Sequence, residues 1–144
     1  MINQAFCSSF KQQLLEGVHD FSVAGGDTFK IALFAEAANL NTATTAYAVT
    51  NEVVAAGYTA GGYTLTNIAP AISGQTAVAS FATASWTANI TARGALIYNT
   101  TPNGAYTNPA CIVLDFGMDR VSTAGVFTVQ FPAMAAGTAI VSIA

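Results

Sequence analysis

The stretch Gly57–Thr64, GYTAGGYT, decides between two folds for this chain. It matches the phosphate-binding pattern G-x-x-x-x-G-K-[ST], except that Tyr63 stands in place of the lysine. A phosphate-binding loop leads into a helix whose N-terminus holds the anion. Here the following residues, TLTNIAP, are rich in β-branched side chains and reach Pro70, so no helix is expected. We therefore interpret Gly61 and Gly62 as a tight turn into a strand, where glycine accepts positive φ angles.

From this turn onward the sequence predicts short strands separated by turn-forming residues. Turn signals occur at Ser73-Gly74, at Pro102–Gly104 and at Thr123–Gly125. The expected strands are Tyr63–Ile68, Thr76–Phe81, Ser85–Thr87, Ile90–Tyr98, Ala110–Phe116, Val126–Phe131 and Thr138–Ile143. Short strands at this spacing are typical of an antiparallel β-sandwich or barrel. We predict a mainly β, antiparallel β-sandwich or barrel-like domain.

The N-terminal segment has a different periodicity. Four apolar side chains recur at helical spacing, namely Phe6, Phe10, Leu14 and Val18. This pattern predicts a short amphipathic helix within residues 4–18, packed on a sheet. An extended arm formed by residues 1–20 is the alternative.

Between this helix and the glycine turn we expect one strand and a loop. Asp27–Phe34 is rich in β-forming residues and predicts the strand. Ala35–Thr45 is small and polar, as in a loop, whereas Tyr47–Ala56 is open between a loop and a helical turn. At 144 residues the chain has the length of one domain, which we take as residues 1–144.

The composition is poor in charge. Only 8% of the residues are charged and 53% are apolar, whereas an ordinary soluble domain has about 25% charged residues. The cores of protein interfaces are depleted in charge, so we expect a good part of this surface to face other protein. The alternative is a surface of small and threonine side chains that simply tolerates water.

The charge balance and the hydropathy pattern exclude several classes of partner. A net charge of −3, with four scattered basic residues, argues against nucleic acid binding. No stretch approaches the roughly 20 apolar residues of a membrane span. The N-terminus shows no basic start followed by an apolar run, so we expect no signal peptide, and a product that at first stays where it is made.

The two cysteines, Cys7 and Cys111, lie far apart in the sequence and have no C-x-x-C spacing. We expect buried free thiols in a reducing compartment. A bridge between them, within a chain or between chains, is the alternative.

Asp115-Phe116-Gly117 spells the DFG motif of protein kinases, but the other kinase motifs are missing. We interpret Phe116 as the end of a strand and Gly117 as the start of a turn. Asp115 and Asp119 could form a carboxylate pair of the kind used by glycosidases, but Arg93 is a better partner for Asp115. A buried Arg93–Asp115 pair would fix strand register rather than carry out chemistry.

The remaining residues that could act in catalysis or in ligand binding are mostly explained by structural roles. His19 is the only histidine, no G-x-S-x-G motif accompanies it, and we expect it at the surface or at a helix end. Trp86 is expected in the core rather than as a sugar platform. The tyrosines near loops are candidates for ligand or protein contacts, namely Tyr47, Tyr58, Tyr63, Tyr98 and Tyr106.

Read in order, several motifs resemble a family of small virion proteins of tailed bacteriophages. These are YAVTNEVVAAGYTAGGYTL at 47–65, then Trp86, ITARGALIY at 90–98, the segment 112–117 that ends in DFG, and the segment 127–131. The resemblance covers residues 29–132. The residues that match its pattern, interpreted as fold-defining, are Tyr58, Gly61, Gly62, Arg93, Gly94, Asp115 and Gly117. The loops Ala35–Thr45 and Thr100–Asn108 are particular to this sequence.

The resemblance implies a virion component, assembled in the host cytoplasm and located on the capsid exterior. Its expected role is that of a decoration (cement) protein, bound to the major capsid protein and, by analogy, a homotrimer. The alternative is a tail- or fibre-associated protein that binds the host surface through its tyrosine-bearing loops. We expect no enzymatic activity, cofactor or metal. A glycan hydrolase using Asp115 or Asp119 is the enzyme alternative.

Overall fold

The computed structural model describes residues 1–144 and shows a mainly β, antiparallel, sandwich-like domain. One helix is present, α1 (Ser8–Leu15). The strands are β1 (Ala5–Phe6), β2 (Phe29–Phe34), β3 (Tyr63–Thr64), β4 (Asn67–Ser73), β5 (Thr76–Phe81), β6 (Ala84–Thr87), β7 (Thr91–Asn99), β8 (Ala110–Val121), β9 (Val126–Val129) and β10 (Val141–Ile143). The predicted fold class is therefore confirmed.

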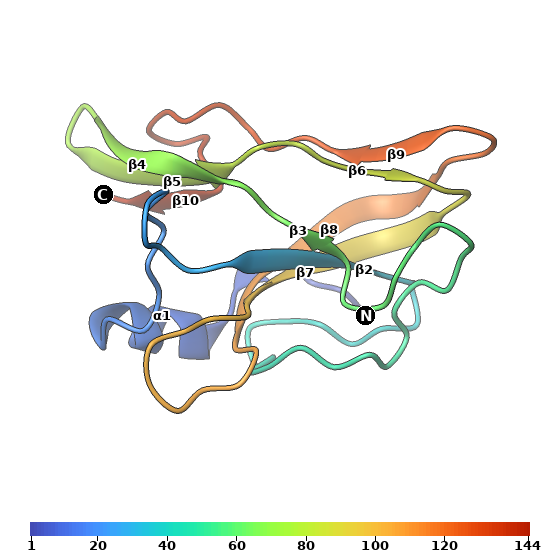
Figure 1. Cartoon of the computed structure of the whole chain (residues 1–144), viewed down its shortest axis with the longest axis horizontal. Helices are drawn as coiled ribbons and strands as arrows, with labels where there is room; N and C mark the ends of the chain where they lie inside the picture. Colours follow the sequence, from blue (N-terminus) through green and yellow to red (C-terminus); the bar gives the residue numbers. More distant parts are fainter.

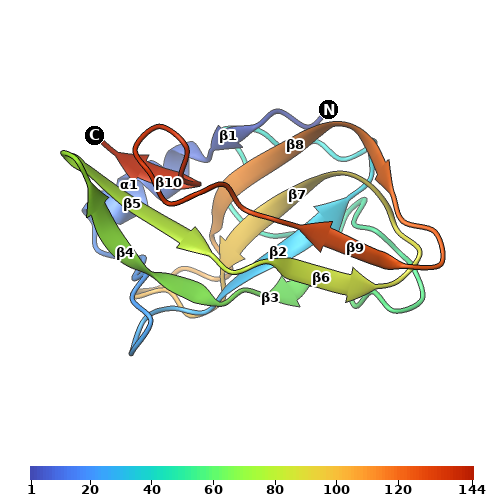
Figure 2. The same cartoon turned by 90° about the horizontal axis from the view of Figure 1, so that it is seen from above.

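The strands form two layers (Figure 1). The lower layer is a five-stranded antiparallel sheet in the order β1-β8-β7-β2-β3. The upper layer consists of a three-stranded sheet, β10-β5-β4, and a two-stranded sheet, β6-β9. Seen from above, these two small sheets lie end to end, with β6 and β9 over the lower sheet and β4, β5 and β10 on the side of α1 (Figure 2).

The core lies on both sides of the lower sheet. Helix α1 and the long loops between β2 and β3 lie beneath this sheet, while the small sheets lie above it (Figure 1). As a result β2 is buried at five of its six positions and β7 at seven of nine. Strands covered on both faces are expected to be continuous apolar runs, as the IALF part of β2 and the GALIY part of β7 are.

The predicted strands differ most from the observed ones at β3 and β4 and at β8, while most of the others differ by one to three residues at an end. The expected strand Tyr63–Ile68 is split into β3 and β4, and β4 runs through Pro70. Pro70 is tolerated because β4 is an edge strand whose register shifts between Ile68 and Ala71, so the missing N–H removes no ladder hydrogen bond.

The sequence suggested that Gly117 opens a turn, and this prediction is wrong. Strand β8 continues through Gly117 to Val121. Gly94 pairs with Asp115, but Ala92 pairs with Arg120, so the extra residues of β8 form a bulge. Gly117 lies in this bulge with a φ of +78°, a conformation that glycine adopts without strain. In the ambiguous segment 47–56 the structure shows turns and no helix.

Candidate assembly surface

The glycine turn at 57–64 is a packing requirement of the fold. Gly62 has a φ of +82°, and a Cβ atom there would lie 1.9 Å from the carbonyl oxygen of Ile31. Gly61 has a φ of +95°. The chain then enters β3, which pairs with β2, so the turn interpretation is confirmed and no helix follows that could hold a phosphate.

Glu52, which the sequence analysis did not single out, explains the rest of this motif. Its side chain is buried, and its carboxylate accepts hydrogen bonds from the hydroxyls of Tyr47 (2.5 Å) and Tyr58 (2.6 Å) and from the backbone N–H of Gly61 (2.8 Å). The Tyr58 hydroxyl in turn accepts the N–H of Leu33. A glutamate five residues before the GYT sequence was the signal that could have revealed this network. The network joins the loop 47–62 to β2.

The tyrosines of this network are held as neutral donors. Burial, and then the hydrogen bond to Glu52, raise the pKa values of Tyr47 and Tyr58 well above the usual range. Burial also raises the pKa of Tyr98 to about 12, and its hydroxyl donates to the carbonyl of Gly61 at 2.7 Å. The Tyr47 ring stacks on Tyr98 with centroids 4.5 Å apart. The cluster is therefore an internal brace.

Arg93 and Asp115 pair as predicted, with 3.2 Å between Nε and Oδ1, while each side chain keeps about a quarter of its surface exposed. Asp115 also accepts the N–H of Gly117 at 2.8 Å, and this bond, followed by the Arg93 guanidinium, lowers its pKa. The pair lies beside Gly94, where a Cβ atom would approach the carbonyl oxygen of Leu114 to 2.4 Å. These residues fix the bulge of β8, and Asp119 forms no ion pair with them.

His19 is buried, so the prediction of a surface or helix-terminal histidine is wrong. Its Nε2 donates to Oε1 of Gln13 at 2.8 Å, and its Nδ1 accepts from the amide of Asn99 at 3.0 Å. Burial lowers its pKa from about 6.5 to about 4, which keeps the ring neutral. Sequence reasoning missed this environment because Asn99 comes from β7, which is distant in sequence.

The same cluster contains Cys111, whose Sγ lies 3.9 Å from Nδ1 of His19. Although cysteine, histidine and asparagine together suggest a thiol nucleophile, Cys111 is fully buried and burial raises its pKa. The lone pair of Nδ1 is already engaged by Asn99, so the histidine cannot take the thiol proton. The group is a packed polar core without access for a substrate.

Both thiols are free and buried, as predicted. Cys7 and Cys111 lie on neighbouring segments, where the N–H of Cys7 donates to the carbonyl of Cys111 at 2.9 Å. Burial raises the pKa of Cys7 to about 11, so it is not a reactive thiolate at neutral pH.

The predicted contact tyrosines differ in their availability. The Tyr47 hydroxyl is engaged by Glu52, as described above. Tyr63 keeps 36% of its surface exposed beside Trp86, which is in the core as predicted. Tyr106 is 41% exposed, and its hydroxyl donates to Glu16 at 2.7 Å.

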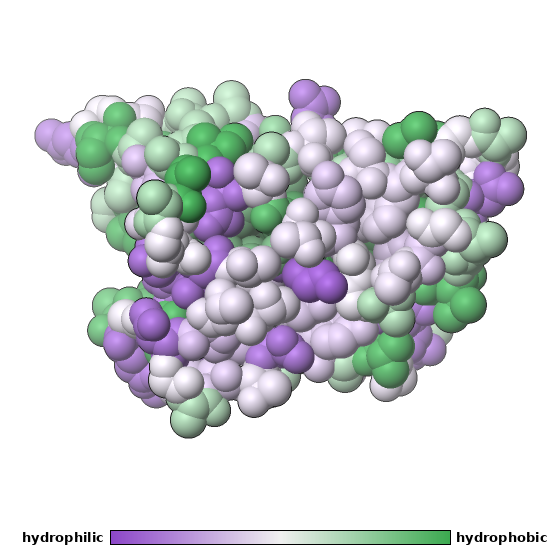
Figure 3. Space-filling view, in the orientation of Figure 1, coloured by the Kyte–Doolittle hydropathy of each residue, from purple (hydrophilic) through white to green (hydrophobic).

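The most unusual surface belongs to the upper layer. No charged residue occurs from Val53 to Ala92 or from Val121 to Ala144, and all five strands of this layer lie within those two segments. Apolar residues are nevertheless exposed on them, with Ile72 at 73%, Ile143 at 57% and Val126 at 56%. Along the top of Figure 3, where this layer lies, pale and green atoms predominate and purple ones are sparse.

We define the charge-free layer as the outward surface of β4, β5, β6, β9 and β10. Isolated apolar residues are common on any surface, but five strands without one charged side chain are typical of surface that contacts protein. The charge depletion noted in the composition is therefore concentrated on one side of the molecule.

Comparisons with protein-family models, with curated proteins and with solved structures found no match for this chain. The helical part of the chain has neither the length nor the apolar character needed to cross a membrane.

Proposed function

We propose that this protein is a structural component of a tailed-phage virion, namely a decoration (cement) protein on the outside of the head. In this role it stabilises contacts between subunits of the major capsid protein, and it associates with itself as a homotrimer. The charge-free layer carries the proposal, because a protein with this surface gains most from being covered by other protein.

The mechanism proposed is mechanical. Each copy spans neighbouring shell subunits and binds the assembled lattice but not a free subunit, so binding stabilises the assembled state by mass action. Small hydroxyl and alanine side chains, which cover much of β4, β5 and β6, permit close approach of a flat partner surface without burying an unpaired charge.

The motifs that resemble the virion family support this proposal indirectly. Gly62, Gly94 and the Arg93–Asp115 pair all hold backbone geometry. A pattern made of such residues marks a shared scaffold rather than a shared reaction.

The test is quantitative mass spectrometry of purified virions of the phage that encodes the chain, counting this protein against the major shell protein. A copy number comparable to that of the shell protein is expected. Absence from the particle would overturn the proposal. In a second measurement, the purified protein should bind expanded heads that lack it and should not bind free shell subunits.

A tail- or fibre-associated role is the second candidate, and the exposure of Tyr63 and Tyr106 favours it. Exposed tyrosines are common anchors in recognition surfaces. This candidate predicts a few copies per virion and binding of the purified protein to host cells, which Tyr106→Ser should weaken. Failure of the native protein to bind cells would count against it.

A further inference from the structure

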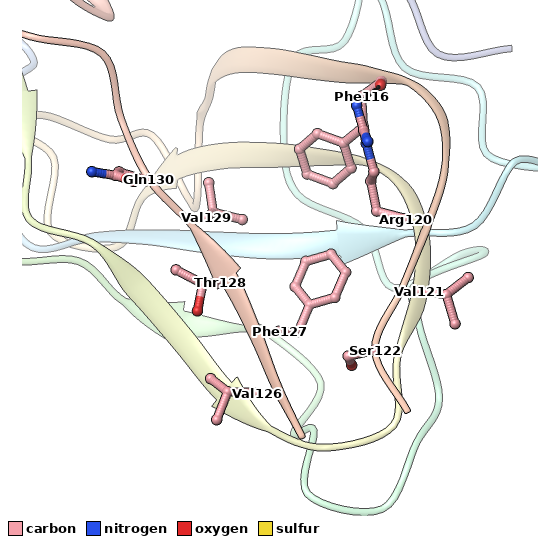
Figure 4. A pocket seen from close by; sticks show the side chains of 9 residues that line it. All are labelled: Phe116, Arg120, Val121, Ser122, Val126, Phe127, Thr128, Val129 and Gln130. Carbon is pink, nitrogen blue, oxygen red and sulfur yellow. Dashed lines mark hydrogen bonds between the residues drawn. The ribbon is translucent and has the colours of Figure 1, made fainter. Parts of the chain in front are cut away.

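A cleft of about 350 Å³ lies between the far half of β8 and strand β9 (Figure 4). The rings of Phe116 and Phe127 line it and contact each other, tilted by 48° with centroids 6.3 Å apart. Val121 and Val129 add apolar surface, and Arg120 supplies the only charge in the lining. The cleft thus combines aromatic and valine side chains with the polar side chains of Ser122, Thr128 and Gln130 and with one cation.

The cleft exists because two consecutive strands diverge. Strands β8 and β9 are joined by the short segment 122–125, but β8 pairs with β7 and β9 pairs with β6. Beyond Asp115 the second edge of β8 has no strand beside it, and neither has the second edge of β9. Unpaired edges of this kind are templates for an added strand.

The free edge of β9, like that of β6, has none of the features that protect an edge strand, and of these two edges it is β9 that borders the cleft. The outer edge of β4 contains Pro70 and a register shift, two features that prevent strand addition. Strands β1 and β3 have only two residues each, and β10 has three. By contrast, β9 presents VFTV without proline, bulge or charge.

Arg120 indicates the chemistry of the occupant. It forms no ion pair within the chain, and the hydrogen bond of its Nη2 is to the carbonyl of Phe116, at 3.5 Å. The other arginine, Arg93, is paired with Asp115 and Glu36. An arginine without a carboxylate, next to a partly apolar cleft and an open strand edge, is complementary to an acidic extended peptide.

We propose that this cleft binds an extended segment of a partner protein by strand addition to β9. The segment inserts an apolar side chain between Phe116 and Phe127 and places a carboxylate on Arg120. Main-chain hydrogen bonds to β9 supply affinity, and the cleft and the arginine supply specificity. This inference concerns the cleft alone and holds whether or not the protein belongs to a virion.

The experiment uses the full chain and end-capped, fluorescein-labelled peptides of alternating valine and threonine with one central glutamate. Matched peptides carry glutamine or lysine at the centre, and binding is measured by anisotropy at low salt. The glutamate peptide should bind roughly two- to fivefold more tightly than the glutamine peptide, as for a partly exposed ion pair. Arg120→Gln should abolish this difference, whereas Lys11→Gln, which removes an exposed cation on α1, should preserve it.

Two further readouts separate recognition from a general loss of structure. Arg120→Glu should reverse the preference so that the lysine peptide binds best, and an unchanged urea midpoint would show that the variant is folded. Amide exchange of Val126–Val129 should slow when the glutamate peptide binds, because strand addition protects those N–H groups. Absence of binding by every peptide, equal affinity for all three, or unchanged exchange at β9 would each overturn the proposal.

Discussion

The two layers of the molecule differ in how they are stabilised and in the surface that each presents to its surroundings. All eleven charged residues belong to the lower sheet or to the helix and loops around it, and the buried polar groups there are joined in networks around Glu52 and His19. The upper layer has no charge, consists of two small sheets and exposes apolar side chains. The difference teaches that the lower layer holds its charges and buried polar groups in internal networks, whereas the outward face of the upper layer is suited to being covered.

Gly62→Ala should have the largest effect, because it disrupts the lower layer at its tightest backbone contact. An added Cβ would lie 1.9 Å from the carbonyl of Ile31 at a positive φ, so we expect a loss of at least about 4 kcal/mol of unfolding free energy. Gly74→Ala is the matched control in the upper layer, since its φ is +63° but nothing lies within 4 Å. It should cost only about 1 kcal/mol in urea denaturation, and equal losses would contradict the comparison.

Acid should weaken the lower layer through His19. Burial lowers its pKa from about 6.5 to about 4, so the unfolded chain binds more protons between these values. The contribution of the neutral ring is complete above pH 6.5 and is lost as the pH falls toward 4, a total of about 3 kcal/mol. Urea midpoints measured from pH 7 to 4.5 should fall accordingly. His19→Gln should remove this pH dependence, and a native midpoint that stays constant would refute the prediction.

Glu52→Gln tests the network that braces the glycine turn. The amide keeps one acceptor oxygen but places an NH₂ group where Tyr47, Tyr58 or Gly61 now donates, so we expect a loss of about 2 kcal/mol. Glu36→Gln is the control, because that side chain is 73% exposed and its contact with Arg93 is 3.7 Å long. It should change stability by less than about 0.5 kcal/mol, and if both variants behave alike the network is not structural.

Ile72→Arg should have the smallest effect on folding and should instead sharpen the contrast between the layers. Ile72 is 73% exposed on β4, so the unfolding free energy should change by less than about 0.5 kcal/mol. If the charge-free layer mediates assembly, the new cation should reduce self-association in light scattering and occupancy on virions. Leu15→Arg on α1, where the side chain is 92% exposed, should leave both unchanged. Unaltered association of the Ile72 variant would direct attention to another surface.

Local patterns in the sequence predicted much of the fold in both layers. The strand at Thr76–Phe81 has its predicted bounds, the glycine turn leads into a strand, and Arg93 pairs with Asp115. These features depend on alternation, on turn chemistry and on opposite charges in neighbouring strands, all of which are visible in short windows of sequence.

What the sequence did not predict depends on residues that meet only in the folded chain. A glycine after a strand is the same signal for a turn and for a bulge, so Gly117 was misassigned. His19 is buried by Asn99 and Cys111, and Glu52 acquires its donors from both sides of a loop. The open edge of β9 could not be foreseen either, because it depends on which strands fail to pair.

The strand order has a consequence for synthesis. Strand β1 pairs with β8 and β2 pairs with β7, so the first strands of the lower sheet lack their partners until the far part of the chain has emerged from the ribosome. At typical translation speeds this delay is on the order of ten seconds, and sheets built from such distant pairs also close slowly. Throughout it the uncharged segment 53–92 is exposed without the native sheet beneath it. The protein is therefore most prone to aggregation during its synthesis. Slower expression at lower temperature should raise the soluble yield more than any substitution that stabilises the folded state.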